Sequence, residues 1–184
     1  MLRIRFLFGS PAAELGPPTR MVFIPDSDIT RLLDAVPSFR EPWRKAQASQ
    51  AKYAAEFPDG AQTPEERVNA FLGRLAYHVG ERVAAGRLDE VESLGVALES
   101  VYSGIPEQVA HELTIGFLES LVYGTEYAGG DASKIAPFMT GSHTRWRWRQ
   151  AYGYAQGVYL YDRASDTESD TPQSAINVRR PNER

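Results

Sequence analysis

The chain of 184 residues carries 20 Lys and Arg against 24 Asp and Glu, and it contains no cysteine. The lack of cysteine excludes disulfides, thiolate metal sites and a catalytic thiol, and it is consistent with a cytoplasmic protein, which is what we expect. The formal net charge of −4 disfavours a nucleic-acid partner, which requires a basic face, and no apolar run is long enough to predict a membrane partner.

Three zones are expected along the chain. Residues 1–25 form a Gly- and Pro-rich entry segment, residues 26–162 form a helical domain, and residues 163–184 form a polar tail. The tail has little apolar surface to bury, so its composition predicts disorder. Met21 is an alternative start to Met1.

Two helices are expected at the beginning of the helical domain. Acidic and hydroxyl side chains at residues 26–28 are candidate N-caps for the first helix. Pro37 ends that helix, because proline cannot continue a helical hydrogen-bond ladder. The second helix is expected over residues 38–56, directly after this break.

The next helix has the strongest start signal in the chain. Thr63 can cap it, Pro64 suits the first helical position, and Glu66 can complete a capping box. The helix is amphipathic, because apolar residues recur at steps of three and four until Gly86 ends it: Val68, Phe71, Leu72, Leu75, Val79 and Val83.

Three further helices are expected, over residues 89–102, 106–124 and 142–161. The middle one has the widest apolar arc and should therefore be the central helix; the arc consists of Val109, Leu113, Phe117 and Leu121, widened by Ile115, Leu118 and Val122. Short connections favour antiparallel helical hairpins. The predicted fold is all-α, an irregular bundle or a short HEAT-like stack.

The histidines do not form a metal-binding pattern. The three of them, His78, His111 and His143, fall in separate predicted elements. His111-Glu112 begins like a zinc-protease motif, but Ile115 stands where that motif requires its second histidine. No Gly-rich phosphate loop is present either, so we expect no metal, no cofactor and no enzymatic activity.

Basic and aromatic residues alternate from Arg145 to Arg149, a composition seen in nucleic-acid binding. On a helix, alternate positions do not share a face, and Trp148 would lie with Tyr152. The favoured interpretation is that one or both tryptophans pack on the body while the arginines stay in solvent. Aromatic residues of this helix, including Trp146 and Tyr154, remain candidates for contact with a partner.

Charge is distributed unevenly along the domain. Between Arg87 and Lys134 there is no Lys or Arg, but this stretch contains nine Asp or Glu residues. Seven-residue spacing is expected to keep each set of glutamates on nearly one face of its helix: Glu92 and Glu99, then Glu112, Glu119 and Glu126. These rows predict an acidic surface for a basic partner. The alternative is a solvated face that only aids solubility.

Residues 29–148 resemble an uncharacterised bacterial helical family associated with immunity proteins of polymorphic and contact-dependent toxin systems. The resemblance is sharpest in the block Gly116-Phe117-Leu118-Glu119. The other matching positions are Leu32-Leu33-Asp34-Ala35-Val36-Pro37, Trp43, Val68, Phe71, Leu72, Glu99, Val109, Leu113, Leu121, Phe138, Met139 and Trp146. The entry segment and the tail have no counterpart.

The resemblance implies an inhibitor that binds a cognate toxin stoichiometrically and performs no chemistry. An acidic face would suit a basic nuclease toxin, because carboxylates can occupy the groove meant for phosphate. A helical scaffold or adaptor for other proteins is the competing class. A third alternative is a small enzyme built on scattered carboxylates such as Glu112 and Glu119.

Overall fold

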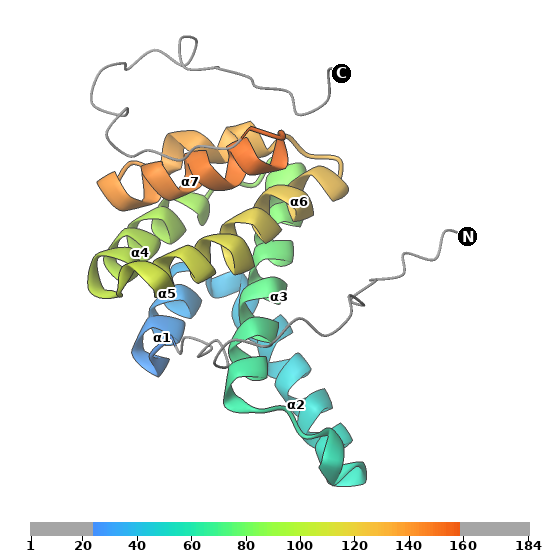
Figure 1. Cartoon of the computed structure of the whole chain (residues 1–184). Helices are drawn as coiled ribbons and strands as arrows, with labels where there is room; N and C mark the ends of the chain where they lie inside the picture. Colours follow the sequence, from blue (N-terminus) through green and yellow to red (C-terminus); the bar gives the residue numbers. More distant parts are fainter. Residues whose placement is uncertain (1–23, 159–184) are drawn as a thin grey trace, which may run out of the picture.

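A computed structural model of the chain describes residues 24–158, so most of the entry segment and the whole predicted tail lie outside the described residues (Figure 1). The described residues form helices and loops without a strand, which confirms the all-α class. Stacking in HEAT-like hairpins stays a prediction. The helices are α1 (Asp26–Ala35), α2 (Arg40–Glu56), α3 (Pro64–Ala84), α4 (Val91–Gly104), α5 (Glu107–Leu113), α6 (Ser120–Tyr127) and α7 (Ser142–Ala155), with a π-helical segment at Thr114–Glu119 and 3₁₀ segments at Pro37–Phe39, Pro58–Gly60 and Ala132–Phe138.

The capping box at the start of α3 is confirmed. Thr63 Oγ1 accepts a hydrogen bond from the Glu66 backbone N–H at 3.2 Å, and Glu66 Oε2 accepts one from the Thr63 N–H at 2.8 Å. At the start of α1, Pro25 holds the N-cap position and provides no side-chain cap. The predicted caps at residues 26–28 are therefore wrong; Asp26 and Asp28 lie in the first turn, where carboxylates favour the positive end of the helix dipole.

The central helix is longer than predicted and contains a π-helical turn. Backbone angles stay helical from α5 through Thr114–Glu119 into α6. Gly124 does not end the helix, which continues to Tyr127 before Gly129 adopts a φ of 79°. A π turn holds one residue more than an α turn, which changes the face that each following residue occupies. Ile115, predicted to lie in the apolar arc, is 47% exposed.

Helix α3 passes through the middle of the molecule and packs most extensively against α6 (Figure 1). A Cβ atom on Gly80 would lie 2.7 Å from the Thr125 backbone nitrogen, closer than such atoms can approach. A Cβ on Gly124 would lie 3.4 Å from the Tyr77 Cα. The two backbones therefore meet at glycines, and larger side chains of both helices interdigitate on either side of that point.

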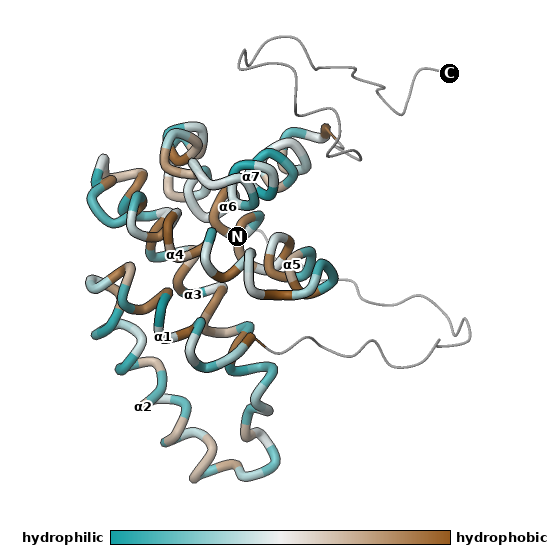
Figure 2. The backbone as a smooth tube through the Cα atoms, turned by 90° about the vertical axis from the view of Figure 1, so that its left-hand side faces the viewer, coloured by the Kyte–Doolittle hydropathy of each residue, from teal (hydrophilic) through white to brown (hydrophobic). Residues whose placement is uncertain are grey.

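The remaining helices surround this pair unevenly. Helix α7 lies across the π-helical segment and α4, and α1 packs on α4. Helix α2 contributes no fully buried residue, and it extends away from the body of the molecule together with the beginning of α3 (Figure 2). The buried core thus lies between α1, α3, α4, the α5–α6 helix and α7.

We predict that Gly80→Ala destabilises the fold by about 1–3 kcal/mol, because its methyl group must displace the α6 backbone. Gly73 is the matched control on the same helix, since a Cβ there meets nothing within 4 Å. Gly73→Ala should stabilise the chain by up to about 1 kcal/mol through helix propensity. Chemical denaturation measures both values, and equal effects of the two changes would contradict the close α3–α6 contact.

Candidate functional site

Glu99, one of the predicted partner-binding residues, caps α7 within the chain. Its carboxylate accepts hydrogen bonds from the backbone N–H groups of His143 (3.1 Å) and Thr144 (2.8 Å) and from Thr144 Oγ1 (3.0 Å). Gly141 leaves space for it, because a Cβ there would lie 2.2 Å from the Glu99 carboxylate. Glu92, seven residues earlier on α4, is exposed. Although these two glutamates are seven residues apart on one helix, Glu92 is exposed to solvent whereas Glu99 is bound to the start of α7.

The cap has a defined pH dependence. Partial burial opposes ionisation of Glu99, but the hydrogen bonds from the Thr144 and His143 backbone N–H groups outweigh it and lower the pKa of the carboxyl. A carboxyl with a lower pKa in the folded state stabilises the fold above its unfolded pKa. That contribution is lost as the pH falls through the folded pKa.

The π-helical segment divides the predicted row of glutamates on the central helix, which consists of Glu112, Glu119 and Glu126. Glu112 precedes that segment, and the extra residue offsets it from Glu119 by roughly 100° around the helix axis. Glu119 and Glu126 remain on one face of α6. Glu126 is exposed and accepts a hydrogen bond from Gln156 Nε2 of the segment after α7, at 3.2 Å. Glu119 is half-buried, and no described side chain pairs with it.

Helix α7 places a basic side chain against the segment between Arg87 and Lys134, which contains no Lys or Arg of its own. Arg147 is buried and forms an ion pair with Glu107 of α5. The prediction that the arginines of α7 stay in solvent is therefore wrong for Arg147. Trp146 and Trp148 are both buried, and Trp148 stacks on Tyr152 with ring centroids 6.1 Å apart, which confirms the predicted packing. Trp146 thus presents little surface to a partner.

Exposed tyrosines that were not among the predicted partner contacts lie beside Glu119 and Glu126. Tyr123 and Tyr127 are exposed and share the same face of α6. From α3, the Tyr77 ring contacts Tyr127 edge to face, with centroids 6.5 Å apart. Tyr154 of α7 is also exposed. We call the set on α6 and α3 the acidic tyrosine surface: Tyr77, Glu119, Tyr123, Glu126 and Tyr127.

A hydrogen-bonded Ser, His and Glu set joins the Pro37–Phe39 segment to α3 and α4. Ser38 Oγ lies 2.7 Å from His78 Nε2 and donates to Glu90 Oε2 at 2.5 Å, and Arg82 pairs with the same Glu90 oxygen. In a catalytic triad the imidazole lies between the hydroxyl and the carboxylate and removes the hydroxyl proton. Here the Ser38 hydroxyl lies between the other two groups and donates its hydrogen bond to the Glu90 carboxylate. The arrangement therefore serves to hold these elements together.

Residues 24–158 contain no group of three or more His, Asp or Glu side chains placed to hold a metal ion. Within the same range, no helix has both the length and the apolar character needed to cross a bilayer. No protein-family model matches the chain, and no curated protein or solved structure matches it significantly. The resemblance to immunity-associated domains therefore stays a prediction from the sequence.

We predict that Glu99→Gln lowers the free energy of unfolding by about 1 kcal/mol at neutral pH, as loss of a helix N-cap does. The difference from the unmodified chain should begin to shrink as the pH falls below the unfolded pKa of glutamate, about 4.3, and should vanish only below the lower folded pKa, where the carboxyl is protonated in both states. Glu92→Gln, in the first turn of the same helix, should cost less, a few tenths of a kcal/mol, because it loses only its interaction with the α4 dipole. Urea titrations over this pH range test the prediction, and a loss that does not vary with pH would contradict the charged cap.

Proposed function

We propose that this protein is a non-catalytic, stoichiometric binder of a basic protein, and that the acidic tyrosine surface is its binding site. The observation that carries the proposal is the convergence of exposed tyrosines and carboxylates on α6, with a further tyrosine from α3. Tyrosine is enriched in protein interfaces, because its ring buries a large area with few rotatable bonds and its hydroxyl can form a hydrogen bond.

The partial burial of the Glu119 carboxyl favours a cationic partner. Its pKa is raised because burial disfavours the charged form, and no described side chain compensates that charge. A Lys or Arg from a partner would supply the missing counter-charge in a partly desolvated site, where ion pairs are stronger than on an open surface. Glu119 is also the last residue of the π-helical segment, a type of distortion that is frequent at functional sites.

Within this class we favour a bacterial, cytoplasmic immunity protein that neutralises a cognate toxin, in line with the sequence resemblance. Such a protein acts by covering the toxin, so shape and charge suffice and no catalytic group is required. A scaffold or adaptor is the alternative function. It would need a second binding surface for another protein.

The test begins with the genes beside the one that encodes this chain. Immunity requires a neighbouring toxin gene whose product binds the purified chain at 1:1 stoichiometry and whose expression stops growth unless this chain is also made. We expect Glu119→Lys/Glu126→Lys to weaken that binding by about 100-fold and to abolish protection, because reversed charges repel the basic partner. Association of the unmodified pair should slow as salt rises, since charge is screened over about 8 Å at physiological ionic strength.

Glu56→Lys/Asp59→Lys is the matched control, because it makes the same change in net charge at exposed positions beside the far end of α2. This variant should bind and protect like the unmodified chain. A Glu119→Lys/Glu126→Lys variant that folds normally and still protects would overturn the proposed surface. A chain that binds the neighbouring gene's product without protecting cells would instead favour the scaffold function.

A further inference from the structure

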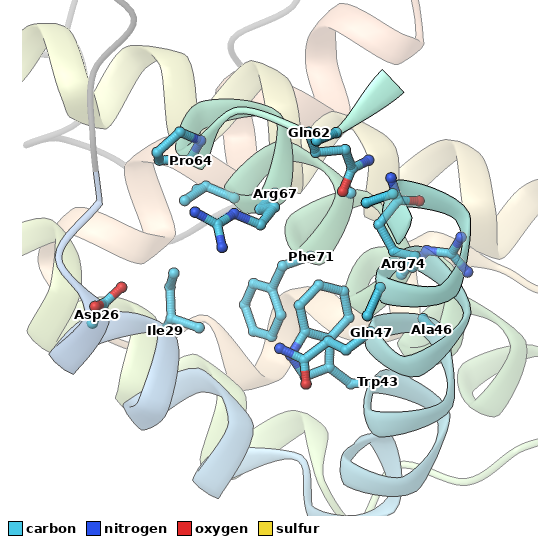
Figure 3. A pocket seen from close by; sticks show the side chains of 16 residues that line it. Asp26, Ile29, Trp43, Ala46, Gln47, Gln62, Pro64, Arg67, Phe71 and Arg74 are labelled. Atoms are coloured by element: carbon cyan, nitrogen blue, oxygen red, sulfur yellow. The ribbon is translucent and has the colours of Figure 1, made fainter. Parts of the chain in front are cut away.

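A groove of 720 Å³ lies between α1, α2 and the first half of α3 (Figure 3), and none of its lining residues belongs to the acidic tyrosine surface. Its floor is aromatic: the Trp43 and Phe71 rings meet edge to face, with centroids 5.1 Å apart. Val68 of α3 and Ile29 of α1 extend the apolar lining. The groove exists because α2 and α3 diverge from this aromatic contact instead of packing along their length.

Helix α2 presents one regular stripe to the groove. Trp43, Ala46, Gln50 and Ala54 recur at steps of three and four residues, and all four are half-buried lining residues. Such spacing is typical of a helix that packs against other helices. Alanine at two of these positions leaves room for a further backbone to approach closely. A 17-residue helix with no fully buried residue gains little stability from its own chain, so added packing here would stabilise it.

The upper wall of the groove is basic. Arg67 and Arg74 are two turns apart on α3, both line the groove, and both are exposed. Neither forms an ion pair with any residue in 24–158. Asp26 is the one carboxylate among the described lining residues, so the lining carries an excess of positive charge in a protein whose net charge is −4.

We propose that this groove binds an acidic amphipathic helix of a partner protein. The helix would place apolar side chains over Trp43 and Phe71 and would complete a three-helix arrangement with α2 and α3, the usual way in which an amphipathic helix enters an apolar groove. Its carboxylates, spaced two turns apart, would pair with Arg67 and Arg74. The inference goes beyond the proposed function, since it concerns a second partner of opposite charge at a different site.

The test uses two synthetic helical peptides of roughly 18 residues, long enough to span the groove. Both carry leucines at the same heptad positions; one has Glu and the other Lys at the flanking positions, and each bears a fluorescent label. By fluorescence anisotropy, the full-length chain should bind the Glu peptide at least about tenfold more tightly than the Lys peptide. Arg67→Glu/Arg74→Glu should reverse that preference.

Lys52→Glu/Arg87→Glu is the control for net charge, because both positions are exposed and neither lines the groove. It should keep the preference of the unmodified chain. Trp43 gives a second readout: the Glu peptide should protect a tryptophan from acrylamide quenching, and this protection should vanish in Trp43→Phe. Equal binding of both peptides, or equal losses in the groove variant and the control, would overturn the proposal.

Two other occupants would give distinct results. If a second copy covers the groove, the free chain will sediment as a dimer that Arg67→Glu/Arg74→Glu dissociates, and the partner helix is then ruled out. If another part of the same chain covers it, the free monomer will already shield Trp43 from acrylamide and will bind neither peptide. Either result overturns the proposal without affecting the tests on Glu119 and Glu126.

Discussion

The crossing of α3 and α6 at Gly80 and Gly124 is the contact on which the rest of the structure depends. Two helix backbones can approach this closely only where side chains are absent, and the buried residues on either side then have fixed positions. The crossing fixes the rotation of α6 about its own axis, so that its apolar face is buried and its other face is exposed. It also brings Tyr77 of α3 beside Tyr127 of α6, so that one packing constraint defines both the core and the acidic tyrosine surface.

The two candidate binding surfaces differ in what supports them. The acidic tyrosine surface lies on helices that are anchored in the core, so its side chains are held in place before a partner arrives, which reduces the entropy lost on binding. The groove lies beside α2, which has no fully buried residue and few contacts with the body. A partner helix there would contribute to the packing of α2 as well as to its own binding, and this favours local adjustment on binding.

Much of the fold could be predicted from local sequence, whereas the sites depend on contacts between distant residues. Periodic apolar residues and the Thr63 capping box predicted the α3 helix well, because these signals act within a few turns. The roles of Glu99 and Arg147 could not be read in this way, since their partners lie 40 or more residues away. Tyr123 and Tyr127 could have been found, because they lie opposite the apolar stripe; Tyr77 required the α3–α6 contact.

The π-helical segment has a consequence for how the length of this chain can change during evolution. A π turn takes up one extra residue without turning the helices on either side of it. Deletion of one residue within Thr114–Glu119 would leave an ordinary α-helix and keep Gly124 facing α3. The same deletion within α6 would rotate the residues after it by roughly 100°. We therefore expect the loss of one residue to disturb the packing of this buried helix least when it falls within Thr114–Glu119.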